Sequence, residues 1–273
     1  MTDQSLATAN NPLGRQVDYP TTYAPEVLHG IPRADARLVL SQQESNKGVD
    51  IWNAWELSWL NLNGQPRVAC AEIRVPSSSA CLIESKSMKL YLGSFNTLRC
   101  SDEVLLANMQ RDLSATAGAP VQVSMVDRDQ AWARRRWPGQ CLDDLDVPCE
   151  IYHIDKSLLH CSPSKDDSVC SVWTDAFRSV CPVTGQPDWA SVLLRYSGVV
   201  IDLPDLLRYL VSYRQHAGFH EQCVEQIFDD VMRQCDPDQL TVYARFSRRG
   251  GIDINPFRSN FEDAPSNTVQ WRQ

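Results

Sequence analysis

The residues most capable of chemistry in this 273-residue chain are a thiol and a carboxylate that flank a short turn. Cys181 and Asp188 stand seven positions apart, and the residues between them read Pro-Val-Thr-Gly-Gln-Pro. Two prolines and a glycine stiffen such a turn, so it can bring both side chains into one small volume. A thiolate there would be a strong nucleophile, and the aspartic acid could deliver a proton to an atom that gains negative charge. Spacing alone favours the blander interpretation, a core cysteine beside a surface turn.

Phe219-His220-Glu221 forms a second candidate group at the start of an expected helix. A carboxylate such as Glu221 can accept two parallel N–H bonds from the amide–amine edge of a guanine-like ring. Phe219 could stack on the same ring. The alternative is structural, because a first-turn carboxylate is favoured by the helix dipole and a histidine there can cap the helix or lie on the surface.

Two further segments could bind phosphate. Glu84-Ser85-Lys86-Ser87-Met88-Lys89 combines a carboxylate, hydroxyls and two ammonium groups, with Lys86 and Lys89 as point charges. The alternative is an amphipathic helix start with its charges in solvent. Arg249 and Gly250 offer a second anion site, because glycine permits close backbone approach. No GxGxxG follows an expected strand, so a Rossmann dinucleotide domain is unsupported.

Composition excludes several classes of protein. The net charge of −8 makes nucleic acid an unexpected partner, because an acidic surface repels phosphate backbones. No apolar run approaches 18 residues and the N-terminus lacks an apolar signal core, so we expect no membrane span and a cytoplasmic protein. The ten cysteines form no CxxC pair, and we expect free thiols and no metal site.

The chain also aligns with itself. Residues 83–95 align with residues 201–213 at an offset of 118, and Gly64-Gln65-Pro66 aligns with Gly185-Gln186-Pro187 at an offset of 121. A three-residue insertion between the two blocks accounts for the difference. In this alignment Cys181 falls on Leu60 and Asp188 on Arg67. One copy therefore carries the thiol and acid, whereas the other carries the two lysines, and we expect an active site divided between them.

Each copy predicts the same order of elements. Alternating or β-branched runs at 68–75 and 191–196 predict strands, as do those at 121–125 and 240–244. Apolar stripes predict helices through 104–113, 206–213 and 224–232; Asp202 is the expected N-cap of the second of these, and Asp236-Pro237 is expected to end the third. Strands followed by helices predict an α+β fold with antiparallel sheets and the helices on one face. We expect two repeats, residues 1–135 and residues 136–273.

The sequence of residues 128–168 gives the weakest indication of secondary structure. We interpret it as the linker and the first strand of the second copy. Arg134-Arg135-Arg136 predicts a solvated loop rather than a nucleic-acid patch, because carboxylates follow at Asp143, Asp144 and Asp146.

At the segment Glu84-Ser85-Lys86-Ser87-Met88-Lys89-Leu90-Tyr91 the chain resembles the NADPH-dependent 7-cyano-7-deazaguanine reductases of queuosine biosynthesis. The Cys181–Asp188 spacing, Phe219-His220-Glu221, Arg249-Gly250 and Asp253-Ile254-Asn255-Pro256 match that family as well. The resemblance covers nearly the whole chain, in the long two-repeat form. It implies the tunnelling fold, in which tandem duplicated ferredoxin-like units close barrels by association, and therefore a homodimer.

The resemblance also implies a reaction and the residues for it. A nitrile would be reduced by four electrons to a primary amine with two NADPH. Cys181 would attack the nitrile carbon to form a thioimide, and Asp188 would protonate the nitrogen. The implied substrate pocket consists of Ile83, Glu84, Ser85, Phe219, His220 and Glu221. The implied NADPH contacts are Ser85, Lys86, Lys89, Arg249 and Gly250.

Two rival functions remain at this point. Related tunnelling-fold enzymes, such as GTP cyclohydrolase I and pterin synthases, bind pterins or purines with a glutamate similar to Glu221. Those enzymes commonly use zinc, whereas the five histidines here have no zinc-like spacing. The other rival is a purine-binding module without catalysis, for which Cys181 would be dispensable.

Overall fold

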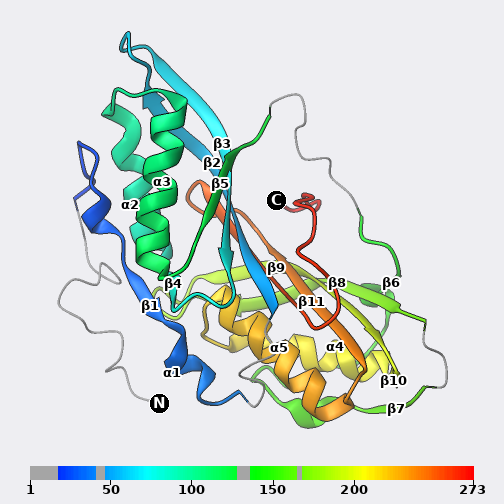
Figure 1. Cartoon of the computed structure of the whole chain (residues 1–273). Coiled ribbons are helices and arrows are strands. Elements are labelled where there is room, and N and C mark those ends of the chain that lie inside the picture. The colour runs from blue at the N-terminus through cyan, green and yellow to red at the C-terminus, as the bar shows by residue number, and fades with distance from the viewer. Residues whose placement is uncertain (1–17, 41–46, 128–135, 165–167) are drawn as a thin grey trace. The chain divides into compact units, whose positions relative to one another are not determined.

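A computed structural model describes residues 18–40, 47–127, 136–164 and 168–273 (Figure 1). Contacts within the chain divide it into two compact units. Unit 1 comprises Met1–Ala36, Trp52–Ala131 and Arg249–Ile252, and unit 2 comprises Arg37–Ile51, Trp132–Arg248 and Asp253–Gln273. Unit 1 therefore includes a short segment from the C-terminal part of the chain, and unit 2 includes a short segment from the N-terminal part.

The described part of unit 1 combines antiparallel strands with the short helix α1 and the longer helices α2 and α3. Its elements are η1 (Pro25–Val27), β1 (Gly30–Pro32), α1 (Arg33–Arg37), β2 (Lys47–Leu60), β3 (Pro66–Pro76), β4 (Cys81–Ile83), α2 (Ser85–Ser94), η2 (Phe95–Thr97), α3 (Asp102–Ala117) and β5 (Gln122–Met125). Strands β5, β3 and β2 are neighbours in that order, and β1 pairs with β4. The alternating burial of Ala71, Ile73 and Val75 along β3 is the period of a strand with one buried face.

Helix α3 has a capping residue at each end. The Ser101 side chain caps it by accepting a hydrogen bond from the Val104 N–H, and Gly118 ends it with a φ of 68°. Leu105, Met109 and Leu113 form its buried stripe. Val104, which the apolar pattern placed in that stripe, is 49% exposed and does not belong to the buried face.

Unit 2 repeats the pattern. Its elements are β6 (Gln140–Cys141), η4 (Leu142–Asp144), η5 (Lys156–Leu158), β7 (Cys161–Pro163), β8 (Cys170–Val180), β9 (Pro187–Ser197), β10 (Val199–Ile201), α4 (Leu203–Ser212), η6 (Tyr213–Gln215), α5 (His220–Cys235), β11 (Gln239–Phe246) and β12 (Ile252–Ser259). The strand order is β2–β12–β11–β9–β8–β6, and β8, β9, β11 and β12 pair antiparallel. The expected α+β class with antiparallel sheets is confirmed.

Both faces of the unit 2 sheet are apolar. Alternate residues Val192 and Leu194 of β9 join the main core with α4 and α5, which lie on one side of the strands (Figure 1). Leu193 between them belongs to a second cluster on the other face, with Trp173 and Tyr243. As predicted, the Asp202 side chain caps α4, and α5 ends at Cys235 before Asp236, which has a φ of 47°.

Matching contacts support the internal repeat. In unit 1 the Tyr91 hydroxyl donates to Asp112 Oδ2 over 2.8 Å, and in unit 2 the Tyr209 hydroxyl donates to Asp230 Oδ2 over 2.7 Å. Both members of the pair recur at an offset of 118. The short pairings β1–β4 and β7–β10 also correspond. The change of offset lies where expected, because four residues separate β3 from β4 and only Gly198 separates β9 from β10.

The segment expected to hold the linker and first strand of the second copy is more irregular than predicted. Its described part contains the two-residue strand β6, two 3₁₀ turns and the three-residue strand β7, and the long strand β8 begins only at Cys170. Arg134 and Arg135 lie outside the described residues. Within the described part of the chain, no helix is long and apolar enough to cross a membrane.

Candidate active site

The candidate nucleophile lies at the end of a β-hairpin in unit 2. Ser179 of β8 stands opposite Asp188 of β9, and the Cys181 N–H donates to the Gln186 carbonyl over 2.9 Å. Cys181 and Asp188 are therefore diagonal neighbours on one face of the hairpin, a relation in which Cβ atoms lie about 7–8 Å apart. Asp188 is buried at 7% exposure, whereas Cys181 is partly exposed. Burial of the acid and access for the thiol both suit covalent chemistry.

The turn itself corrects the sequence alignment. Cys181 corresponds to Asn61 and not to Leu60. The Gly64 N–H donates to the Asn61 carbonyl in unit 1, and the Gly185 N–H donates to the Cys181 carbonyl in unit 2. The unit 2 turn is one residue longer, which displaced the alignment by one. The Asn61 side chain accepts hydrogen bonds within its own turn, so unit 1 has a turn-forming residue where unit 2 has the thiol.

A backbone pairing brings the start of α5 to the end of β8. The Val180 N–H donates to the His216 carbonyl over 2.9 Å, and the Gly218 N–H donates to the Val180 carbonyl over 3.2 Å. Phe219, the N-cap residue of α5, follows directly, and its N–H donates to the Gln222 side chain. This pairing places the Phe219-His220-Glu221 group beside the hairpin that carries Cys181.

His220 makes the most informative contact of the site. Its Nε2 lies 3.4 Å from Asp188 Oδ2. The imidazole stacks on Phe246 with ring centroids 3.8 Å apart and planes 8° apart. Its Nδ1 is buried and has no hydrogen-bond partner among the described residues. His220 and Asp188 are therefore placed to exchange a proton, and Phe246, which the sequence analysis did not single out, fixes the ring.

Glu221 differs from its counterpart in unit 1. It is 3% exposed, whereas Glu103, which aligns with it at the offset of 118, is fully exposed at the start of α3. A buried carboxylate is costly unless partners compensate it. The two helix starts therefore differ, because only the glutamate of unit 2 is buried, beside the hairpin that carries Cys181.

Burial of His216 next to this site predicts a pH effect on stability. Burial lowers the pKa of His216, so on acidification the unfolded chain binds a proton first. The free energy of unfolding is therefore expected to fall as pH drops below about 6.5 and to level off below the lower pKa of the folded state. Urea unfolding at about pH 7.5 and about pH 5.5 measures this. A His216→Gln variant is expected to lose less stability over that interval; equal losses in both proteins would refute the assignment.

The unit 1 candidates gather at the start of α2. Ile83 is buried at the end of β4, and Glu84 is the N-cap of α2. Its two carboxylate oxygens accept from the Lys86 and Ser87 N–H groups, each over 2.7 Å. The structural role considered for Glu84 is thus present, and its oxygens keep lone pairs for a further donor. Ser85 and Lys86 in the first turn are partly exposed.

The turn that contains Arg249 and Gly250 packs on the same helix. Gly250 has a φ of 64°, and a Cβ atom there would lie 2.9 Å from Lys89 Cε and 3.1 Å from Lys89 Nζ. The Arg249 N–H closes the turn by donating to the Ile252 carbonyl. Lys89 and Gly250 thus form a basic cradle, in which only glycine allows the Lys89 side chain to pack so closely. The structure therefore brings Lys89 together with Arg249 and Gly250, although about 160 positions separate them in the sequence.

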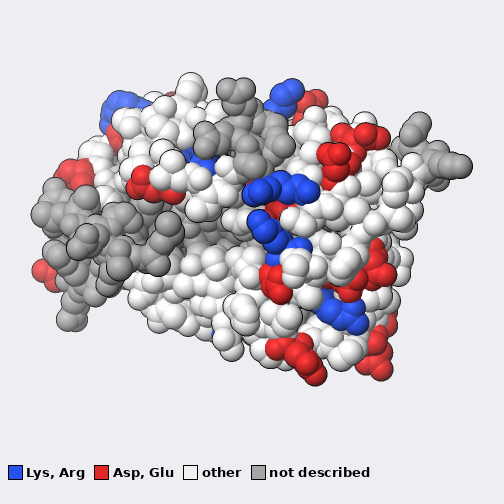
Figure 2. Space-filling view, turned by 90° about the horizontal axis from the view of Figure 1, so that it is seen from below, with Lys and Arg blue, Asp and Glu red and all other residues white. Residues whose placement is uncertain are grey.

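Other parts of the surface offer less for chemistry. Among the described residues, no group of three His, Cys, Asp or Glu side chains could hold a metal ion. On the face shown in Figure 2, Lys and Arg side chains gather near the middle and Asp and Glu side chains stand beside them. A phosphate backbone would meet both signs of charge on this face.

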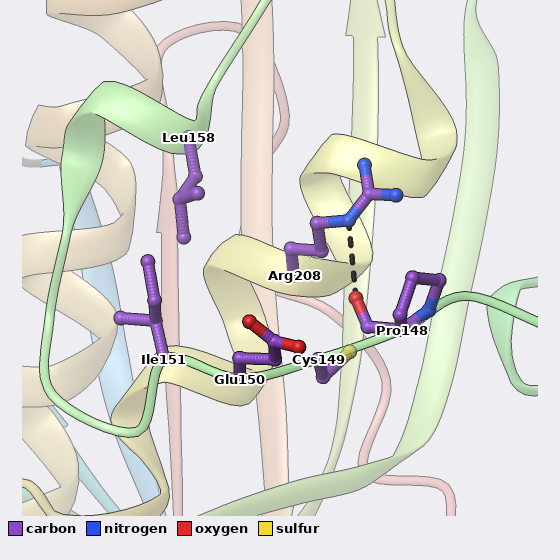
Figure 3. Close-up of a pocket in the computed structure, with 6 residues that line it drawn as sticks. All are labelled: Pro148, Cys149, Glu150, Ile151, Leu158 and Arg208. Atoms are coloured by element: carbon purple, nitrogen blue, oxygen red, sulfur yellow. Dashed lines mark hydrogen bonds between the residues drawn. The ribbon is translucent and has the colours of Figure 1, made fainter.

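A separate pocket of about 290 Å³ lies in unit 2 (Figure 3). Ile151 and Leu158 point towards each other across it, and Arg208 of α4 donates from Nε to the Pro148 carbonyl. Its other lining residues are Cys149 and Glu150. Pockets for ligands of drug size usually have about 300–1,000 Å³, so this one is small for a dinucleotide. None of the predicted site residues lines it.

Comparison with known proteins matches most of the chain. The family described as nitrile reductase, 7-cyano-7-deazaguanine-reductase N-term, matches residues 19–125, and the family described as QueF-like protein matches residues 187–265. The NADPH-dependent 7-cyano-7-deazaguanine reductase of Bordetella pertussis is 49% identical over 270 residues, with 97% of this chain and 98% of that protein covered. The protein of the same name from Chromobacterium violaceum is 46% identical, with 96% and 95% covered.

A solved structure was matched over a smaller part of the chain. It is that of the archaeosine synthase QueF-Like in the apo form, with a TM-score of 0.34 and 21% identity over 36% of this chain and 99% of that chain. Membership of a family rests on the near full-length relatives and on the two family matches. The chain belongs to the NADPH-dependent 7-cyano-7-deazaguanine reductase family.

Proposed function

We propose that this protein reduces the nitrile of 7-cyano-7-deazaguanine to the primary amine of 7-aminomethyl-7-deazaguanine with NADPH, a step of queuosine biosynthesis. The observation that carries the proposal is a contact between two residues near Cys181. Buried Asp188 lies on the hairpin that presents Cys181, and it contacts His220 at the start of α5. Neither a structural cysteine nor a simple purine-binding module requires an acid and a histidine at this position.

Cys181 acts as the nucleophile in the proposed reaction. Its thiolate adds to the nitrile carbon, and the nitrogen takes a proton from Asp188, which yields a thioimide. The thiolate leaves again after the first reduction, and the resulting imine is reduced to the amine. Each turnover consumes several protons, so Asp188 must be protonated again. His220 lies 3.4 Å from Asp188, within reach of proton exchange after a small movement.

Recognition of the deazaguanine is assigned to the group at the start of α5. The buried carboxylate of Glu221 accepts two N–H bonds from the amide–amine edge of the base. His220 contributes polar contact and Phe219 stacking. Ile83, Glu84 and Ser85 of the first repeat complete the proposed substrate set. Burial of Glu221 beside the hairpin that carries Cys181 supports this assignment, because a buried carboxylate binds N–H donors more strongly than one in solvent.

NADPH is assigned to the cradle on α2. Ser85, Lys86, Lys89, Arg249 and Gly250 would hold its phosphates, and the Lys89 ammonium beside Gly250 supplies a cation for such a group. NADPH supplies a hydride for each of the two reductions. We assign the cofactor motif to the first repeat, residues 1–135, and the nucleophile and substrate glutamate to the second, residues 136–273. Arg249 and Gly250 belong to the second repeat by sequence and to unit 1 by their contacts.

Gly250→Ala tests the cradle. The added methyl group meets Lys89, and alanine is strained at a φ of 64°. The KM for NADPH is therefore expected to rise about tenfold, equivalent to about 1.4 kcal/mol, with a smaller change in kcat. The matched control is Gly93→Ala in α2, where an added Cβ has no neighbour within 4 Å. If both variants keep the wild-type KM, the cradle does not bind NADPH.

Intact mass spectrometry tests the proposed function directly. The protein is mixed with 7-cyano-7-deazaguanine in the absence of NADPH, and an adduct with the mass of the substrate is expected. The adduct should be absent in Cys181→Ala and should disappear when NADPH is added to the wild type, with formation of the amine. An unmodified wild-type protein that also fails to oxidise NADPH would overturn the proposal.

The proposal extends to assembly and location. We propose a homodimer, because units of the tunnelling fold close barrels by association, and light scattering would measure its mass. We also propose that the protein works in the cytoplasm. All ten cysteines lie in the described residues and none is in a disulfide, which suits a reducing compartment.

A further inference from the structure

One indole in unit 2 is surrounded by positive charge. The guanidinium carbons of Arg178, Arg214 and Arg272 lie 5.7, 5.5 and 5.3 Å from the centroid of the Trp189 ring. All three distances are within the range of cation–π contact. The three arginines come from β8, from η6 and from the C-terminal segment, and Arg178 stands directly opposite Trp189 in the β8–β9 register.

None of these arginines has a carboxylate partner among the described residues. Arg178 donates to the Arg214 carbonyl, and Arg272 donates to the Asp175 carbonyl. The Asp175 carboxylate is already engaged, because its two oxygens accept from Ser191 and Trp271. A guanidinium has five N–H donors, so the described residues leave most donors of this cluster unused.

Several other arginines of unit 2 pair with carboxylates. Arg37 and Arg258 bind Glu225, Arg195 binds Glu262, and Arg208 binds Asp205. In a chain with net charge −8, carboxylates are available for such pairs. The Trp189 cluster instead holds three cations that are separated by no more than about 11 Å, the sum of two distances to the ring. The Debye length at physiological salt is about 8 Å, so their repulsion is only partly screened.

The cluster is also accessible to solvent. Arg214 is exposed, and Arg178, Arg272 and Trp189 are partly exposed. An anion that arrives from solvent can therefore reach guanidinium groups which the fold already holds in place. The indole contributes attraction to each cation but carries no charge with which to neutralise them.

We propose that Arg178, Arg214 and Arg272 around Trp189 form a binding site for a phosphate group. A phosphate carries more than one negative charge and several acceptor oxygens, so it can neutralise several cations at once, and the planar fork of arginine binds it in a bidentate manner. Cations already surround the indole, so the site recognises the phosphate itself and not a stacked base. None of these four residues belongs to the proposed NADPH cradle, which is assigned to unit 1.

Calorimetric titration of the full-length protein with inorganic phosphate tests the site, with sodium chloride at equal ionic strength as the reference. Saturable binding of one phosphate per chain is expected. Arg178→Gln and Arg272→Gln should each weaken it at least tenfold, whereas Arg178→Lys, which keeps the charge and loses the fork, should weaken it less. Arg233→Gln is the matched control, because Arg233 has a carboxylate neighbour in Asp229 and lies on α5, away from Trp189 in the sequence. Circular dichroism verifies that each variant is folded. If one of the two Gln variants does not fold, the other one still tests the site.

A parallel titration with NADP+ identifies the source of the phosphate. If inorganic phosphate binds and the Gln variants lose it, the ligand is free phosphate. If only NADP+ binds and the same variants weaken it, the phosphate is that of the nucleotide. Tryptophan emission gives a second measurement, because Trp189→Phe should remove the change that phosphate causes. The proposal is overturned if the Gln variants bind both ligands as the wild type does, or if neither ligand binds.

Discussion

Replacing Cys181 by alanine is expected to lower turnover by at least about 10³-fold while the protein remains folded. The thiol is partly exposed at the end of a hairpin and belongs to neither apolar cluster of unit 2, so its loss removes the proposed covalent step and little packing. Consumption of NADPH in the presence of 7-cyano-7-deazaguanine measures the loss, and thermal unfolding measures the fold.

A second cysteine variant serves as the control, because it shows whether the loss of any exposed thiol lowers turnover. Cys161 is exposed in β7, and its thiol contacts backbone carbonyls at the end of α5. Cys161→Ala should retain the wild-type rate. A Cys181→Ala protein that turns over within tenfold of the wild type would exclude Cys181 as nucleophile, and the thioimide with it.

Arg258→Met is expected to destabilise unit 2 by about 3–5 kcal/mol, because it removes the fully buried cation that pairs with two buried carboxylates, of which Glu225 keeps Arg37. The Arg258 side chain is fully buried, and its Nη1 and Nη2 lie 2.7 Å from Asp50 Oδ1 and 2.8 Å from Glu225 Oε1. The midpoint of urea denaturation measures the effect. Since Glu225 is one turn of α5 beyond Glu221, the KM for the deazaguanine is expected to rise as well.

The matched control for this ion pair lies in unit 1. Arg74 pairs with Glu72 on β3, where both side chains are partly exposed. Arg74→Met should therefore cost no more than about 1 kcal/mol. Equal effects of the two substitutions would mean that the buried cluster contributes no more than a surface pair.

Local pattern predicted the elements of this fold well. Alternation along 191–196 and the apolar stripe through 224–232 each depend on neighbours within a few residues, and β9 and α5 contain them. The alignment of Asp112 with Asp230 anticipated the matching contacts to Tyr91 and Tyr209, because a duplicated helix pair retains its buried hydrogen bonds.

The pattern could not predict contacts that depend on register or on distant packing. Cys181 was aligned with Leu60 because one extra residue in a turn leaves the flanking strands unchanged. The Asp188–His220 contact joins residues 32 positions apart. The stacking of His220 on Phe246 requires that β11 packs against α5. Neither His220 nor Asp188 has a local signal for these partners. The three arginines around Trp189 are equally invisible, since nothing in their spacing places them on one ring.

Each unit contains a segment from the other half of the chain, and this limits where the gene can be cut into two parts. Asp50, a partner of buried Arg258, comes from the first half of the chain, and Gly250, which covers Lys89, comes from the second. A half-chain that ends at residue 135 lacks one side of the Lys89 cradle, and a half-chain that begins at residue 136 lacks a neutralising carboxylate of its own interior. A cut between residues 135 and 136 would therefore separate both pairs, so a split gene has to produce the two halves together.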